Sequence, residues 1–170
     1  MNKQTDAEKR QQNIHIRPAT ERDTGLILQF IKALAAFEKL ADQVVADEDT
    51  LRASLFGDNP GAEVILAELD GAPVGFALFF HNYSTFLGQR GLYLEDLFVL
   101  ESARGQGVGK ALLQHLAGIA RTRQCGRMEW WVLNWNKPAI DFYKSLRAEA
   151  MDNWTVYRME GAALKALAEN

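Results

Sequence analysis

The sequence has little of several features that mark particular classes of protein. It holds a single cysteine, Cys125, which excludes an internal disulfide and any metal site built from paired cysteines. Its 19 basic residues do not exceed its 22 acidic residues, and a net charge of −3 argues against general nucleic-acid binding. No apolar run approaches the roughly 20 residues that span a membrane. Residues 1–13 also lack the apolar stretch of a signal peptide. We therefore expect a cytoplasmic protein with neither a membrane nor a nucleic-acid partner.

What the sequence does contain is enough apolar material for a core, since 48% of its 170 residues are hydrophobic. We expect a flexible extension over residues 1–13 and a single domain over residues 14–170. Apolar periodicity and turn signals predict an α+β fold. The expected strands are Ile14–Arg17, Ala62–Leu69, Pro73–Phe80, Gly91–Val99, Met128–Leu133 and Trp154–Met159. The expected helices are a first helix that opens at a capping box (Thr20–Asp23) and ends near Lys39, then Asp47–Phe56, Val108–Arg121, Asn136–Ser145 and a terminal turn at Gly161–Ala168.

The most informative stretch is a glycine-rich turn between a predicted strand and a predicted helix. It reads Arg104-Gly105-Gln106-Gly107-Val108-Gly109-Lys110. Backbone N–H groups at the start of a helix bind phosphate oxygens, and glycine lets a phosphate approach the backbone closely. The nucleoside-triphosphate loop and the dinucleotide-binding fingerprint both require other glycine spacings. The turn therefore predicts a phosphate-containing ligand of a different kind, with Arg104 and Lys110 able to add positive charge.

Two motifs in this order resemble those of the GNAT superfamily, the Gcn5-related N-acetyltransferases. The turn fits the acyl-CoA-binding pattern [RQ]-x-x-G-x-[GA], and residues 136–143 fit a downstream pattern, N-x-x-A-x-x-x-Y. The resemblance spans about Ile14 to Met159. Within the superfamily it is closest to the diamine acetyltransferases, including the spermidine/spermine and thialysine enzymes. The supporting segments are Ile16–Thr20, Tyr93–Val99 and Asn134–Pro138. Many members have glycine four residues after the motif tyrosine, where this chain has Arg147.

The resemblance implies a fold and an assembly. The fold is a mixed, mostly antiparallel sheet of six or seven strands flanked by helices, of the three-layer α/β type. In this family the fourth and fifth strands separate, which lets the cofactor insert between them. Homodimers are common among relatives, so we expect a homodimer in which the final strand can pair across subunits.

The resemblance also implies how the cofactor, acetyl-CoA, is bound. Backbone groups of three strand residues would meet the pantetheine arm and the thioester, the glycine turn would hold the pyrophosphate, and the second motif would lie beside the cofactor. Tyr143 would be the general acid for the departing thiolate, since a phenol stays protonated at neutral pH. Taken by itself, Tyr143 would be read as a packed aromatic residue. The predicted cofactor-binding residues are Leu97, Phe98, Val99, Arg104, Gly105, Gln106, Gly107, Val108, Gly109, Lys110, Asn136, Pro138, Ala139 and Tyr143.

Candidates for the acceptor site come from carboxylates and aromatic residues. Glu95 and Asp96 interrupt an apolar strand, which is costly unless the carboxylates are paired, solvated or used. Strand alternation would send them to opposite faces. The family suggests that Glu95 lies on the substrate side, as a base acting through water or as an ammonium anchor. An ion pair within the sheet would explain either residue almost as well. The predicted substrate-binding residues are Phe37, Glu38, Glu95, Trp130 and Trp131.

The sequence thus predicts an acetyl-CoA-dependent N-acetyltransferase acting by direct attack on a small cationic acceptor, such as a polyamine, a diamine or a lysine-like amino acid. Two alternatives are acetylation of a peptide or protein amine and a non-catalytic CoA-binding sensor. The three histidines are isolated from one another, so no metal site is expected.

Overall fold

The computed structural model describes residues 13–169, which divide into two compact units after Trp131. The expected flexible extension falls almost entirely outside these residues. The first unit contains a sheet and its helices: β1 (Ile14–Pro18), α1 (Thr24–Phe37), α2 (Glu48–Phe56), β2 (Glu63–Leu69), β3 (Ala72–Ser84), β4 (Gln89–Val99), α3 (Val108–Thr122) and β5 (Met128–Trp130). Three short 3-10 helices, η1 (Glu21–Asp23), η2 (Ala41–Gln43) and η3 (Glu101–Ala103), complete it. The second unit contains α4 (Lys137–Ser145) and α5 (Gly161–Ala168).

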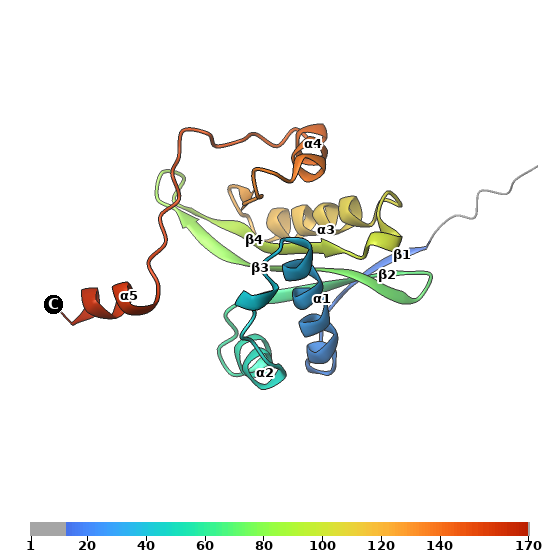
Figure 1. Cartoon of the computed structure of the whole chain (residues 1–170). Coiled ribbons are helices and arrows are strands. Elements are labelled where there is room, and N and C mark those ends of the chain that lie inside the picture. Colours follow the sequence, from blue (N-terminus) through green and yellow to red (C-terminus); the bar gives the residue numbers. More distant parts are fainter. Residues whose placement is uncertain (1–12, 170) are drawn as a thin grey trace, which may run out of the picture. The chain divides into compact units, whose positions relative to one another are not determined.

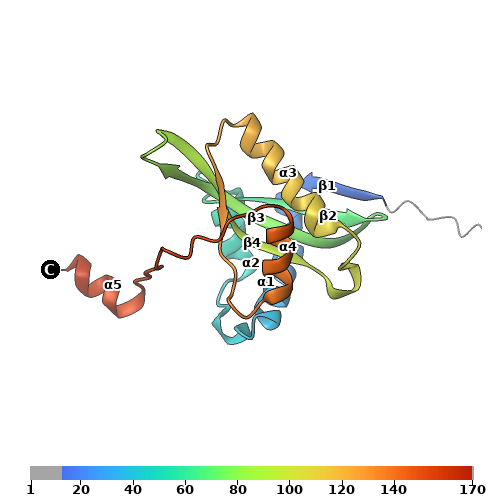
Figure 2. The same cartoon turned by 90° about the horizontal axis from the view of Figure 1, so that it is seen from above.

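The sheet follows the chain order β1-β2-β3-β4-β5 (Figures 1 and 2). The first four strands pair antiparallel, and β5 pairs parallel to β4. The predicted hairpin between β2 and β3 turns at Asp70 and Gly71, whose φ angles of 52° and 83° are left-handed. Such turns match the twist of the paired strands, which is why the Asp-Gly pair predicts this hairpin.

Helices cover both faces of the sheet: α1 and α2 lie on one face and α3 on the other (Figure 1). On the α1 face, the ring of Phe30 stacks on Phe76 with centroids 5.7 Å apart, and Phe98 joins them at 6.4 Å from Phe30. On the other face, α3 buries Leu112 and Leu116 completely. Phe76 and Phe98 are directly paired across β3 and β4, so this part of β4 is fixed by the core.

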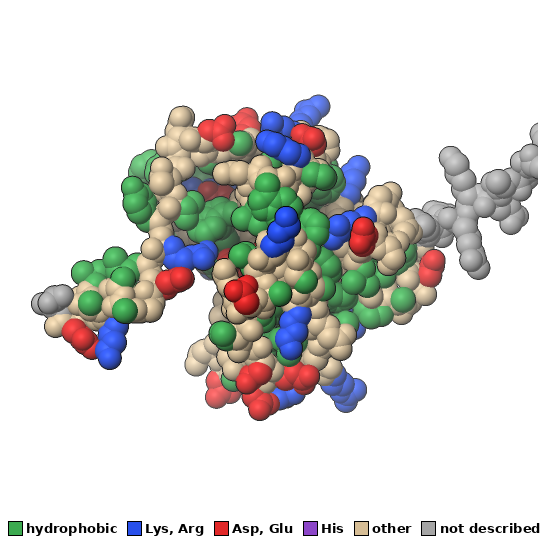
Figure 3. Space-filling view, in the orientation of Figure 1, with side chains coloured by type: hydrophobic (Ala, Val, Ile, Leu, Met, Phe, Trp, Pro, Cys, Tyr) green, Lys and Arg blue, Asp and Glu red, His purple; other side chains and the backbone are tan. Residues whose placement is uncertain are grey.

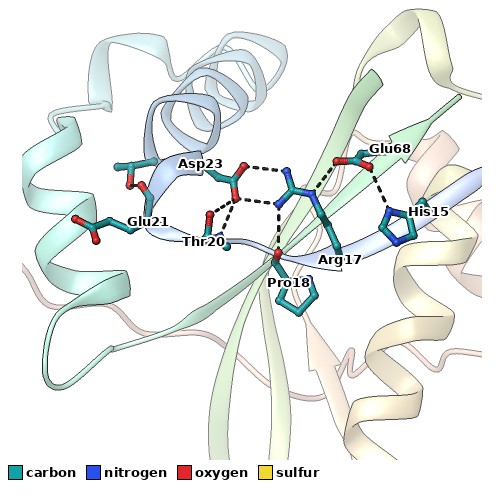
Figure 4. A network of polar contacts seen from close by, with 8 residues as sticks. His15, Arg17, Pro18, Thr20, Glu21, Asp23 and Glu68 are labelled. Carbon is teal, nitrogen blue, oxygen red and sulfur yellow. Dashed lines mark hydrogen bonds and ion pairs between the residues drawn. The ribbon is translucent and has the colours of Figure 1, made fainter. Parts of the chain in front are cut away.

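A polar network fixes the start of α1 against the edge of the sheet (Figure 4). Arg17 on β1 donates to both carboxylate oxygens of Asp23 at 2.9 Å and to Glu68 on β2 at 2.7 Å. Asp23 also accepts from the backbone N–H of Thr20 at 2.7 Å, which completes the predicted capping box. The hydrogen bonds from Arg17 hold the pKa of Asp23 well below its usual range. The network therefore fixes the start of α1 relative to β1 and β2.

The predicted helix positions are confirmed to within a few residues. Asp47 caps α2 by accepting from Thr50 N–H at 2.8 Å, and Asn136 caps α4 by accepting from Ala139 N–H at 3.3 Å. The chain leaves α4 through Arg147, whose φ of 65° is the left-handed conformation that glycine adopts more easily. No helix within residues 13–169 combines the length and the apolar character needed to cross a membrane.

The strand count differs from the prediction. Between residues 13 and 169 the sheet has five strands, and the expected strand over 154–159 is absent. A strand needs a neighbouring backbone to pair with, and alternation of apolar residues cannot supply one. In the second unit these residues have no regular secondary structure and are exposed, with Trp154 72% and Tyr157 90% accessible. The hydrophobic side chains of α5 are likewise exposed (Figure 3).

Candidate active site

The glycine turn connects β4 to α3 through η3 and has the backbone geometry that the motif predicts. Gly105 and Gly107 have φ angles of 74° and 87°, which side chains other than that of glycine rarely allow. Gly107 is the N-cap residue of α3 and has no side chain to satisfy the N–H groups of the first helical turn. The glycine turn and the N–H groups at the start of α3, which we call the cradle, therefore fit an anionic group such as a pyrophosphate.

Arg104 has contacts that its predicted role does not include. Its Nε atom donates to the carbonyl oxygen of Val99 at 3.0 Å. The guanidinium lies 4.6 Å from the ring centroid of Phe37 and 5.7 Å from that of Phe98. Arg104 thus connects the end of α1 to the end of β4 through cation–π contacts. A further contact of this residue with the cofactor stays a prediction.

Strand β4 has an open edge next to this turn. Its parallel pairing with β5 covers only Leu92–Leu94, opposite Met128–Trp130, and within the described chain residues 95–99 have no strand partner on that side. This is the separation of the fourth and fifth strands that the family fold predicts. Strand β5 is also shorter than the predicted Met128–Leu133, because the pairing stops at Trp130. Leu97 and Val99 therefore lie on the part of β4 that pairs with β3 but not with β5.

A β-bulge interrupts β4 at Glu95. Leu94 pairs with Phe79 and Asp96 pairs with Leu78, so Glu95 has no partner of its own on β3. Paired residues share a face of the sheet, and Tyr93 pairs with Phe80, two residues from Leu78. Tyr93 and Asp96 consequently lie on the same face, the one covered farther along by α1. The strict alternation that would separate Glu95 from Asp96 does not hold across this bulge.

Three carboxylates gather where the bulge meets the end of α1: Glu38, Glu95 and Asp96. Burial, followed by the charges of Glu95 and Glu38, raises the pKa of Asp96 to about 6. Burial alone raises the pKa of Glu38. Glu38 follows directly after α1, where the helix dipole is negative. The carboxylate cluster, as we call these three residues, is therefore suited to binding a cation and to accepting a proton near neutral pH.

The parallel register distinguishes between the two tryptophans. Trp130 pairs with Leu94, whose partner Phe79 is on the α3 face, so Trp130 is directed to that side. The ring of Trp131 instead meets Tyr93 edge-on at 5.9 Å, and Tyr93 lies 5.0 Å from Phe80. Trp131 thus shares the face of the carboxylate cluster. Of the two tryptophans predicted to bind substrate, only Trp131 lies on that face.

The residues of the second motif lie in the second unit. There Asn136 caps α4, Pro138 occupies its first turn, and Tyr143 packs its ring 5.6 Å from Phe142. Their approach to the glycine turn and to the carboxylate cluster stays a prediction from the resemblance.

The structure adds three residues, Asp96, Tyr93 and Phe80, to the predicted acceptor site. The sequence favours Glu95 over Asp96 for the substrate side, and it assigns Tyr93 and Phe80 no contact with the acceptor. Their shared face depends on the bulge, and a single sequence carries no clear signal for a bulge in an apolar strand. The acidic pair within the strand was the available hint, because bulges recur beside active sites.

Comparison with known proteins gives consistent results. Residues 29–147 match the sequence model described as the Acetyltransferase (GNAT) family. The chain is 40% identical over 166 residues to a thialysine N-epsilon-acetyltransferase of Bos taurus, covering 91% of this chain and 97% of that protein. It is 32% identical over 197 residues to an L-ornithine N5-acetyltransferase of Arabidopsis thaliana, covering 89% and 86%. Among solved structures, an integron cassette protein from the mobile metagenome of V. cholerae superposes with a TM-score of 0.77 at 31% identity, covering 92% of this chain and 98% of the other.

Proposed function

Since the chain belongs to the GNAT family and is an N-acetyltransferase, we propose that it transfers an acetyl group from acetyl-CoA to a primary amine of a small cationic acceptor. The observation that carries this proposal is the carboxylate cluster beside the open edge of β4. Relatives named for thialysine and for ornithine act on amino acids with a side-chain amine. A lysine-like amino acid, a diamine or a polyamine is therefore the acceptor class.

The chain offers two features that fit acetyl-CoA. The N–H groups around Gly107 would hold the pyrophosphate, and the backbone of Leu97 and Val99 would hold the pantetheine arm through strand-like hydrogen bonds. When bound, the cofactor supplies an activated acetyl thioester. Lys110, in the first turn of α3, adds positive charge near the pyrophosphate.

The carboxylate cluster and Tyr143 would act as general base and general acid. A primary ammonium must lose a proton before its nitrogen can attack. Asp96 would accept that proton directly or through water, with Glu95 beside it as the ammonium anchor. The new C–N bond forms as the C–S bond breaks, and Tyr143 would donate its phenolic proton to the leaving sulfur. The family match over residues 29–147 extends across both units, which supports one catalytic domain that includes Tyr143.

The test of this function is thiol release from acetyl-CoA in the presence of lysine, thialysine, ornithine, spermidine, putrescine and a basic peptide. We expect turnover with at least one small amine. Tyr143→Phe should lower kcat on the order of 100-fold or more, because the proton donor is lost, while CoA affinity is retained. Tyr83→Phe, at an exposed position on β3, is the matched control and should keep full activity. Turnover with the peptide alone would replace the proposal with protein acetylation, and CoA binding without any turnover would favour a sensor.

We further propose a homodimer formed through residues 151–159. Apolar side chains alternate with polar ones over much of this segment, and the exposed aromatic rings of Trp154 and Tyr157 are typical of an interaction surface. Light scattering should give twice the mass of the chain. The double variant Trp154→Ser, Tyr157→Ser should give a monomer, and Phe86→Ser, at an equally exposed position outside the segment, should leave the dimer intact. A monomeric wild-type protein would refute the dimer.

A further inference from the structure

An ion pair lies next to the aromatic residues on the face of the carboxylate cluster. Glu129 pairs with Tyr93 in the parallel register, so its side chain shares that face. Arg127 Nε lies 2.8 Å from Glu129 Oε2, and Arg127 Cγ lies close to the position that a Cβ atom on Gly91 would occupy. Gly91 is the partner of Asn82 on β3. Arg127, Glu129 and Trp131 therefore alternate along one side of β5 and its continuation.

The ion pair is held in place on its inner side. Asn82 Nδ2 donates to the same Glu129 oxygen at 2.8 Å, and a side chain at Gly91 would collide with Asn82 Oδ1. Neither the Arg127 nor the Glu129 side chain has another hydrogen-bond or ion-pair partner in the part of the chain that the structure describes. Their side chains are 40% and 34% exposed, so both charges are accessible to a ligand.

The separation between Tyr93, which lies beside this ion pair, and Asp96 in the carboxylate cluster suits one type of acceptor. Tyr93 and Asp96 are opposite Phe80 and Leu78 on β3, which separates them by two strand residues, or about 7 Å. Glu129 lies beside Tyr93 on the neighbouring strand. An extended four-carbon side chain like that of lysine spans a comparable distance. Its alkyl chain would lie along the rings of Tyr93 and Trp131.

We propose that Arg127 and Glu129 bind the α-carboxylate and the α-ammonium of an amino acid whose side-chain amine reaches the carboxylate cluster. This inference rests on the proposed function and narrows its acceptor class. An ion pair is complementary to a zwitterion, because each of its charges meets the opposite charge of the ligand. A diamine has no carboxylate, so it leaves the guanidinium of Arg127 unmatched beside a second cation.

The experiment compares L-lysine with cadaverine, which is lysine without its carboxylate. A charge-assisted contact to a guanidinium predicts that the wild-type kcat/KM for lysine exceeds that for cadaverine about 10- to 100-fold. Arg127→Met should remove this preference, chiefly by raising the KM for lysine, with kcat changed little. Cadaverine should react at least as well as before, because its second ammonium no longer meets the guanidinium. Arg90→Met is the control, because Arg90 lies on β4 next to Gly91 and is directed to the opposite face.

A binding measurement separates this inference from the proposed function. Calorimetry of lysine with the wild-type and Arg127→Met proteins needs no turnover, and Arg127→Gln replaces the variant if methionine impairs folding. Weaker lysine binding in the variant supports the subsite even if no amine is acetylated, an outcome that would refute only the function. A wild-type preference for cadaverine, or equal losses of both acceptors in Arg127→Met, would overturn the subsite while leaving acetyl transfer intact.

Discussion

Gly107→Val is expected to lower the affinity for CoA by at least about 100-fold while leaving the protein folded. Valine at a φ of 87° is strained by about 1–3 kcal/mol, and the strain is relieved only by moving the backbone out of the left-handed region. That movement turns the N–H groups of the cradle away from the pyrophosphate, and each lost charge-assisted bond costs roughly 1.5–3 kcal/mol of binding. A typical domain stability of about 5–15 kcal/mol tolerates the strain.

The measurement is calorimetric titration with CoA, together with thermal unfolding of both proteins. Gly118→Ala is the matched control: it lies on the same helix, no atom lies within 4 Å of its Cβ position, and its φ needs no glycine. Alanine there should leave CoA binding unchanged and raise stability by about 0.5–1 kcal/mol. If Gly107→Val binds CoA as tightly as the wild type does, the cradle is not the phosphate site.

Asp96→Asn is expected to make the protein more stable and nearly inactive. The folded pKa of Asp96, about 6, is above the ordinary value of 3.8, so the ionised carboxylate is disfavoured in the folded state. Its destabilising effect is absent below the ordinary value, grows as pH rises, and is complete above about 6. The difference between the folded and the ordinary pKa of Asp96 corresponds to a destabilisation of about 3 kcal/mol at most. Asparagine removes this penalty along with the proton acceptor, so kcat should fall on the order of 100-fold or more.

Thermal unfolding at several pH values tests the stability effect. The Tm of Asp96→Asn should exceed that of the wild type by several degrees at pH 8, and roughly half of this advantage should remain at pH 5. The acidic limb of the wild-type kcat/KM profile, with an apparent pKa near 6, should vanish in the variant. A Tm difference that is constant with pH would show that ionisation of Asp96 does not cause the change.

Elements defined by local chemistry could be predicted from the sequence. The Asp70-Gly71 turn, the capping box at Thr20 and the left-handed Gly107 each depend on a few adjacent residues, and the structure has all three. The carboxylate cluster was predicted only in part, because it combines the end of α1 with a bulge in β4. The expected strand over 154–159 was wrong, since a strand depends on a neighbour that its own sequence does not encode.

Which of Trp130 and Trp131 shares the face of the carboxylate cluster could likewise not be predicted from the local sequence. Both are adjacent tryptophans, and strand alternation says only that they lie on opposite sides. Which side each takes depends on the parallel register with β4, fixed here by the pairing of Tyr93 with Glu129. That register is a long-range property of the sheet.

The bulge at Glu95 divides β4 into two segments whose side chains on the α1 face meet different physical demands. Beyond it, Phe98 is held in the core against α1, and a change there would disturb the fold. Before it, Gly91 and Tyr93 share their face with an accessible ion pair and take no part in that core. Leu92 and Leu94 in the first segment are buried on the α3 side. Only the exposed face of that segment, at Tyr93 and its neighbours on β5, can therefore diversify without disturbing the core. Selection for a new amine should accumulate substitutions at Tyr93, Arg127, Glu129 and Trp131 and leave residues 96–99 untouched.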